Sequence, residues 1–304
     1  TTLSGTFESA IAFNTDLSTW DVSKVTTLFR TFNDARAFNS DLSSWDVSKV
    51  TSLAQTFRGC RYIYDICYPN DYAFNSNIST WDVSKVTTLS STFDGARAFN
   101  VDLSKWDVSK VRDMESAFAG TALNSDLSKW DVSKVFRLSK TFRSTSAFNH
   151  DISSWDVSRV TTLSSTFENS LAFNRDLSSW DVSRVTDMSY TFKNARAFNQ
   201  DLSTWDMFKV RTFDGMFAGK VAAFRQGVWC SPSWNNFPTL VLPPGNRVLC
   251  CNPGTFLNDS GSLATTTKSD GSWALTHANI CPKCPMGQYT NTLNLNSSCT
   301  TCAK

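Results

Sequence analysis

The sequence has little of what most catalytic and metal sites require. It contains two histidines in 304 residues, and neither His150 nor His277 stands near a nucleophile motif. No glycine-rich phosphate loop is present either. These absences predict a non-enzymatic protein that uses no cofactor.

An excess of charge of one sign and a long apolar run are also missing. The 29 basic and 27 acidic residues give a net charge of +2, which argues against nucleic acid as the main partner. No apolar run reaches the roughly 18 residues of a membrane-spanning helix, so we expect no span in this segment. What the chain does have is 23 Phe, 11 Trp and 9 Cys, and their placement carries most of the information.

Trp-Asp pairs mark an internal repeat of 25 residues. The unit reads A-F-N-x-D-L-S-x-W-D-V-S-K-V-T-T-L-x-x-T-F-x-x-A-x, with an insertion at 58–72 and a one-residue deletion before Leu123. The unit is too short for a propeller blade, which needs about 40–45 residues. The repeated tryptophans are Trp20, Trp45, Trp81, Trp106, Trp130, Trp155, Trp180 and Trp205.

Each unit divides into a predicted strand half and a predicted helix half. Trp20 and Val22 share one face of the strand, so the Trp row is predicted to be core. Thr27 is the predicted N-cap of a short helix, and Leu28 and Phe32 lie on one face of it. We therefore predict a leucine-rich-repeat-like solenoid with one short parallel strand and one short α-helix per turn, followed by a small disulfide-rich module.

The period ends after Val221, and this sets the expected domain boundaries. Residues 1–222 form a solenoid of about eight repeats. Residues 223–250 form a capping or linker segment, and residues 251–304 form a cysteine-rich module that we expect to continue beyond residue 304. Thr1 to Phe7 align with the second half of a unit, so we expect that end to meet more of the same polypeptide or a neighbouring subunit docked head to tail.

The unit F-N-x-D-[LI]-S-x-W-D-V-S-[KR]-V-T-x-[LM]-x-x-[TA]-F resembles the BspA-type leucine-rich surface-protein repeat, also called the DUF285 repeat. The resemblance spans about residues 1–220 and implies an extracellular protein of the cell surface that acts in adhesion or surface architecture. The first hypothesis is a structural glycoprotein, a subunit of a fibre, surface appendage or matrix, with neighbouring subunits as partners. The alternative is an adhesin or receptor that binds a peptide or glycan on the solenoid sheet face.

One sequence feature bears on these two hypotheses. Binding hot spots favour Trp, Tyr and Arg. The exposed strand positions hold no aromatic anchor, which favours architecture; they are Thr19, Ser44, Thr80, Lys105, Lys129, Ser154, Ser179 and Thr204.

The C-terminal cysteines admit two interpretations. The spacing C-x2-C-x14-C-x2-C from Cys281 to Cys302 is close to that of a zinc ribbon. It also resembles the C-x-x-C-P-x-G-x-Y modules of ephrin-receptor-like and TNF-receptor-like proteins, and an oxidising compartment favours disulfides. The pairing that follows leaves Cys302 without a partner and joins Cys60 to Cys67, Cys230 to Cys250, Cys251 to Cys281, and Cys284 to Cys299.

Three N-x-[ST] sequons predict N-linked glycans, at Asn77, Asn258 and Asn296.

Two rows of acidic residues recur with the repeat. We call the first the outer Asp row: Asp21, Asp46, Asp82, Asp107, Asp131, Asp156, Asp181 and Asp206. Three places after each member stands a residue of the basic row: Lys24, Lys49, Lys85, Lys110, Lys134, Arg159, Arg184 and Lys209. Pairing between these two rows, or hydrogen bonds from turn N–H groups, would offset repulsion within the outer Asp row. Calcium bound along it is the alternative, and no other metal is expected.

The second acidic row, the inner Asp row, is expected to cap turns. It consists of Asp16, Asp41, Asn77, Asp102, Asp126, Asp151, Asp176 and Asp201.

Overall fold

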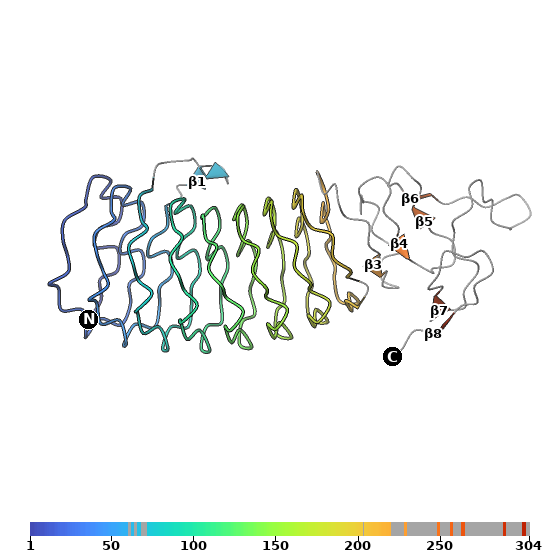
Figure 1. The fold of residues 1–304 in the computed structure, drawn as a ribbon, viewed down its shortest axis with the longest axis horizontal. Coiled ribbons are helices and arrows are strands. Elements are labelled where there is room, and N and C mark those ends of the chain that lie inside the picture. Colours follow the sequence, from blue (N-terminus) through green and yellow to red (C-terminus); the bar gives the residue numbers. More distant parts are fainter. Residues whose placement is uncertain are drawn as a thin grey trace, which may run out of the picture.

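The computed structural model of the chain is a row of stacked coils, each formed by one copy of the sequence repeat (Figure 1). It describes residues 1–59, 72–202 and 204–219, together with eight two-residue strands elsewhere in the chain. Consecutive coils lie side by side, so the long axis of the stack follows the order of the repeats.

One parallel β-bridge joins each coil to the next. The chain of bridges starts at Thr2 and Thr27 and ends at Asp187 and Thr212. Next to the bridges, the N–H of Thr51 donates to the carbonyl of Thr26 at 2.8 Å, and equivalent bonds recur along the stack. The coils are therefore tied together by backbone hydrogen bonds as well as by their interior.

The named strands all lie outside the bridges. In the insertion, β1 (Tyr62–Ile63) pairs antiparallel with β2 (Ile66–Cys67). Further along, β3 (Val228–Trp229) pairs parallel with β4 (Val248–Leu249). The remaining pairs are antiparallel: β5 (Phe256–Leu257) with β6 (Leu263–Ala264), and β7 (Gln288–Tyr289) with β8 (Thr300–Thr301).

The predicted leucine-rich-repeat-like solenoid, with one strand and one helix per turn, is wrong. The described ranges contain no helix, and the expected strand is reduced to one bridging residue per coil. The segment predicted as a helix, from Leu28 to Ala35, consists of β-turns. The N–H of Thr31 donates to the carbonyl of Leu28 at 3.0 Å. The N–H of Ala35 donates to the carbonyl of Phe32 at 3.1 Å.

The turns leave alternate N–H groups free to donate to carbonyls of the neighbouring coil, and these bonds favour the turns over a helix. The N–H of Leu28 donates to the carbonyl of Ser52 at 3.1 Å, and that of Phe32 donates to Thr56 at 2.9 Å. An α-helix would use the same N–H groups within its own segment. In the turns every N–H from residue 28 to residue 35 has a partner, so no backbone donor is left unsatisfied.

Two positions in the turns have a left-handed backbone. In this coil they are Arg30, at φ 56°, and Asp34, at φ 58°. A left-handed residue other than glycine costs about 1–2 kcal/mol, least for Asn and Asp. The second position is held by residues that tolerate this conformation or are small: Ser9, Asp34, Gly95, Gly120, Ser144, Asn169, Asn194 and Gly219.

Stacked aromatic rings fill the interior. Phe32 stacks on Phe38 of its own coil at a centroid distance of 3.9 Å, and on Phe57 of the next coil at 5.5 Å. The ring of Trp45 is parallel to that of Trp81 within 2°. All the repeated tryptophans after the first are buried, as predicted, whereas Trp20 in the first coil is 40% exposed.

A row of buried threonine hydroxyls also links the coils. The hydroxyl of Thr31 lies 2.8 Å from the carbonyl of Leu28 in its own coil and 3.0 Å from that of Leu3 in the preceding coil. Because each buried hydroxyl has carbonyl partners, it adds specificity without an unsatisfied polar group. The fully buried members are Thr31, Thr56, Thr92, Thr141, Thr166 and Thr191.

Several predictions fall outside the described residues. These are the linker at 223–250 and the module at 251–304, apart from strands β3 to β8, and all the disulfide pairs, whose cysteine side chains are not described. Within the described ranges, no helix is long and apolar enough to cross a membrane.

Candidate functional site

The bridge-bearing side of the stack is lined mainly by Thr and Ser. In the first complete coil, the hydroxyl of Thr27 accepts the N–H of Phe29 at 3.1 Å. Asp113 accepts the N–H of Glu115 in the same way at 2.9 Å. The residue predicted to cap a helix therefore caps a turn.

Coils four and five interrupt this pattern. Four of the eight coils have Thr-Thr or Thr-Ser at this position, and two more change one residue of the pair, to Thr186-Asp187 and Arg211-Thr212. Coils four and five change both residues, to Arg112-Asp113 and Phe136-Arg137. Arg137 has no side-chain oxygen with which to accept the turn N–H. A position that abandons a recurring local hydrogen bond is a candidate for function. We name Arg112, Asp113, Glu115, Phe136 and Arg137 the Arg–Phe patch.

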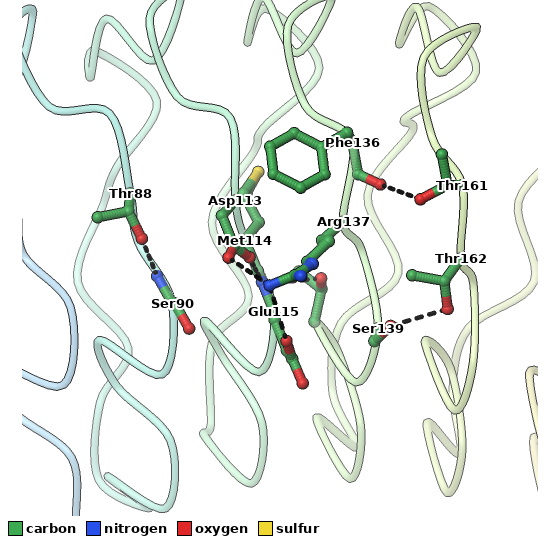
Figure 2. Close-up of polar contacts among 11 residues, drawn as sticks. Thr88, Ser90, Asp113, Met114, Glu115, Phe136, Arg137, Ser139, Thr161 and Thr162 are labelled. Carbon is green, nitrogen blue, oxygen red and sulfur yellow. Dashed lines mark hydrogen bonds and ion pairs between the residues drawn. The ribbon is translucent and has the colours of Figure 1, made fainter.

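Figure 2 shows how the two coils contribute to the Arg–Phe patch. The Nη1 of Arg137 lies 3.4 Å from Oδ2 of Asp113 and 3.9 Å from Oε2 of Glu115 in the preceding coil. The same guanidinium lies 5.5 Å from the ring centroid of Phe136. The Phe136 ring is 39% exposed, so the patch offers an aromatic face next to a guanidinium held in place by two carboxylates.

Backbone bonds keep Phe136 in line with its neighbours. Its N–H donates to the carbonyl of Arg112 at 2.9 Å, and its carbonyl accepts the hydroxyl of Thr161 at 3.1 Å. The side chain of Arg112 is exposed and belongs to no ion pair among the described residues. Sequence reasoning missed Phe136 and Arg137 because it looked for an anchor at the positions of Thr19 and its equivalents. The replacement of Thr-Thr by Phe-Arg was the available signal.

The outer Asp row is held by turn N–H groups. Oδ1 of Asp21 accepts the N–H of Ser23 at 3.0 Å, and the same bond recurs in every coil through to Asp206 and Phe208. The hydroxyl and then the N–H of Ser23 lower the pKa of Asp21, with smaller contributions from Lys24 and Lys49. Hydrogen bonds from turn N–H groups, one of the arrangements expected from the sequence, therefore offset the repulsion within the outer Asp row.

The predicted ion pairing between the outer Asp row and the basic row is not formed. No member of the basic row has an ion pair with any carboxylate in the described ranges, and all of its members are exposed. The ion pairs that do form lie elsewhere on the coils. Glu168, which is buried, contacts Lys193 at 2.9 Å and Arg143 at 3.2 Å.

The inner Asp row caps turns, as expected. Oδ1 of Asp16 accepts the N–H of Ser18 at 2.8 Å, and Asn77 accepts that of Ser79 at 3.0 Å. Beside this row runs a ladder of asparagines that the sequence reasoning had only assigned to turns. The side-chain oxygen of Asn14 accepts the N–H of Asn39, one coil later, at 2.8 Å.

Of the three predicted glycosylation sites, the structure describes one. Asn77 is exposed, whereas Asn258 and Asn296 lie outside the described residues. Among the residues that the structure describes, no group of three or more His, Cys, Asp or Glu side chains could hold a metal ion. Calcium on the outer Asp row stays a hypothesis.

Coils of this kind, stacked and joined by parallel bridges, define a repeat protein built from short units of similar sequence. The chain belongs to the DUF285 family, described as a Mycoplasma protein of unknown function, whose family model matches residues 1–67, 63–134 and 113–229. This confirms the resemblance of the repeat itself, while the resemblance of the cysteine-rich end stays a prediction. No curated protein and no solved structure matches the chain.

Proposed function

We propose that the chain is a non-enzymatic structural component of a cell surface, surface appendage or extracellular matrix. The observation that carries this proposal is the uniformity of the coils. The same stacked rings, and the same hydrogen bonds from indole N–H groups to backbone carbonyls, recur from coil to coil, as do the exposed Asp and basic rows. A stack of this kind gains stability from neighbour contacts alone and can act as a spacer of fixed length.

Immunogold electron microscopy of intact source cells tests this function, using an antibody raised against the 304-residue chain. Gold on the outer surface, on appendages or in the surrounding matrix supports the proposal. Labelling that appears only after the cells are opened contradicts it. Pre-immune serum on the same cells is the control.

The Arg–Phe patch favours a second function, that of an adhesin or receptor for a peptide or glycan. An exposed aromatic ring beside arginine is the composition typical of binding hot spots. Restoring the repeat residues with Phe136→Thr and Arg137→Thr should abolish attachment of the purified protein to a glycan and peptide array while leaving the fold intact. Leu171→Ala removes another exposed apolar side chain outside the patch and is the matched control. Equal binding by all three proteins would contradict this function.

A further inference from the structure

Equivalent residues of successive coils are held in register along the stack, because one parallel bridge joins each coil to the next from Thr2–Thr27 to Asp187–Thr212. Adjacent tryptophan rings are parallel within 3° for Trp130 and Trp155, and again for Trp180 and Trp205. Phe32 and Phe57 also differ by 3°. A side chain repeated at one position therefore forms a row along the stack, and parallel bridges set an expected rise of about 4.8 Å per coil.

Two such rows of opposite charge run next to each other. Every member of the outer Asp row and of the basic row is exposed. Two residues separate each member of the outer Asp row from the following member of the basic row, as between Asp107 and Lys110. The first of these two residues, Val108, is buried in the core. The carboxylates are fixed by turn hydrogen bonds, such as the 3.0 Å bond from Ser109 to Asp107. The basic groups are held by no ion pair in the described part of the chain.

We propose that the chain pairs side by side with a second copy of itself, in parallel orientation, through the outer Asp row and the basic row. The partner is a second copy because the two rows have the same number of members and the same axial repeat. The surface is therefore complementary to itself in charge and in pitch. This inference rests on the proposed structural function, for which it supplies a means of lateral assembly.

Symmetry fixes the orientation. A two-fold axis along the stack exchanges the two rows, so each Asp row faces a basic row and coils of equal number meet. A two-fold axis across the stack leaves each row opposite its own copy, so Asp faces Asp and Lys faces Lys. Like charges placed directly opposite each other repel. Antiparallel pairing is therefore disfavoured at every coil, and parallel pairing is favoured at every coil.

The test measures self-association of the purified full chain by analytical ultracentrifugation. We expect dimers at about 20 mM salt and at least a tenfold weaker association at about 300 mM salt, because screening shortens the range of exposed charges. Lys110→Glu with Lys134→Glu should abolish the dimer. Arg97→Glu with Arg196→Glu changes the net charge equally, at exposed sites outside both rows, and should leave the dimer intact.

Two further measurements keep the result interpretable. Asp107→Asn with Asp131→Asn retains a side-chain oxygen for the turn, so a loss of dimer with unchanged circular dichroism cannot be blamed on misfolding. Carbodiimide cross-linking of mixed light and heavy isotope copies should join Asp107 of one copy to Lys110 of the other. A monomer at low salt, or cross-links between coils at opposite ends, would overturn the proposal. Because these experiments use purified protein, they can fail while the surface location holds, and the reverse is also true.

Discussion

The indole Nε1–H of Trp45 donates a hydrogen bond of 3.0 Å to the carbonyl of Leu17, one coil earlier. Each later repeated tryptophan makes the same bond, between 2.8 and 3.1 Å. The rings of the Trp row therefore fill the interior, and their N–H groups fix the position of one coil on the next.

Trp130→Phe should lower the free energy of unfolding by about 2–4 kcal/mol. The substitution removes part of a buried ring and one of the two donors to the Leu103 carbonyl, which keeps only the N–H of Trp106. Trp20→Phe is the matched control, because Trp20 is 40% exposed, and it should cost less than about 1 kcal/mol. Urea denaturation followed by circular dichroism measures both. Equal effects at the two positions would show that the cross-coil bond adds nothing.

Substitutions at the left-handed position of Ser144, at φ 58°, test the turn architecture. Ser144→Gly should be neutral or stabilise by up to about 1 kcal/mol, because glycine adopts this φ without steric cost. Ser144→Val should destabilise by more than about 1 kcal/mol, because β-branched residues are outliers there. The equivalent residues Gly95 and Gly120 show that glycine fits. If valine proved as stable as glycine in thermal melts, the left-handed assignment would be refuted.

The fold and the site differ in how far the sequence predicts them. The 25-residue period, the buried tryptophans and the turn-capping role of Asp16 all follow from residue type and spacing. The helix does not, because the spacing of Leu28, Phe32 and Ala35 suits two successive β-turns as well as one helical face. Residues such as Asn169 and Gly120 at the left-handed position are typical of turns and poor in helices, and they distinguish the two structures.

The Arg–Phe patch was harder to predict, for a different reason. Phe136 and Arg137 fall in the segment expected to begin the helix half of the unit, where an aromatic residue would be taken for packing. Only the coil geometry places Phe136 outward, in line with Arg112. The sequence showed that Phe136 and Arg137 depart from the repeat consensus. The direction in which their side chains point depends on the backbone conformation, which periodicity does not specify.

Acid should destabilise the protein through the outer Asp row. The hydroxyl and N–H of Ser133 lower the pKa of Asp131 from its usual 3.8, and the equivalent bonds do so for Asp107 and Asp181. A lowered folded-state pKa contributes stability above the unfolded value, and that stability is lost as the pH falls through the folded value. The melting temperature should thus change little from pH 7 to about pH 5 and fall below about pH 4. Asp131→Asn, which keeps the acceptor oxygen, should weaken the fall.

Removing divalent metal should leave the melting temperature unchanged. The carboxylates of the outer Asp row already accept turn N–H groups, as Asp156 does from Ser158 at 3.0 Å, so they need no ion to hold their geometry. Thermal melts with excess chelator, and then with added calcium, measure this. A strong drop with chelator that calcium reverses would favour the calcium hypothesis instead.

Asn77 should carry an N-linked glycan when the protein is secreted from a glycosylating host. Its side chain is exposed in a turn, and its oxygen accepts the N–H and the hydroxyl of Ser79. Intact and peptide mass measurements should find sugar there. Asn77→Asp abolishes the sequon yet restores the residue of the sibling coils, so it should remove the glycan without loss of stability. An unmodified Asn77 peptide would contradict the prediction.

The asparagine ladder has a consequence for how genes of this kind can change. The N–H of Asn75 reaches the side chain of Asn39 at 2.8 Å across a separation of 36 residues, and that of Asn124 reaches Asn100 at 2.8 Å across 24 residues. The junction between coils is thus preserved whether a coil gains or loses residues. Recombination that duplicates or deletes a whole coil would join surfaces that already fit. The reach of the stack can therefore be altered by unequal crossing-over alone, with no compensating substitution anywhere in the chain.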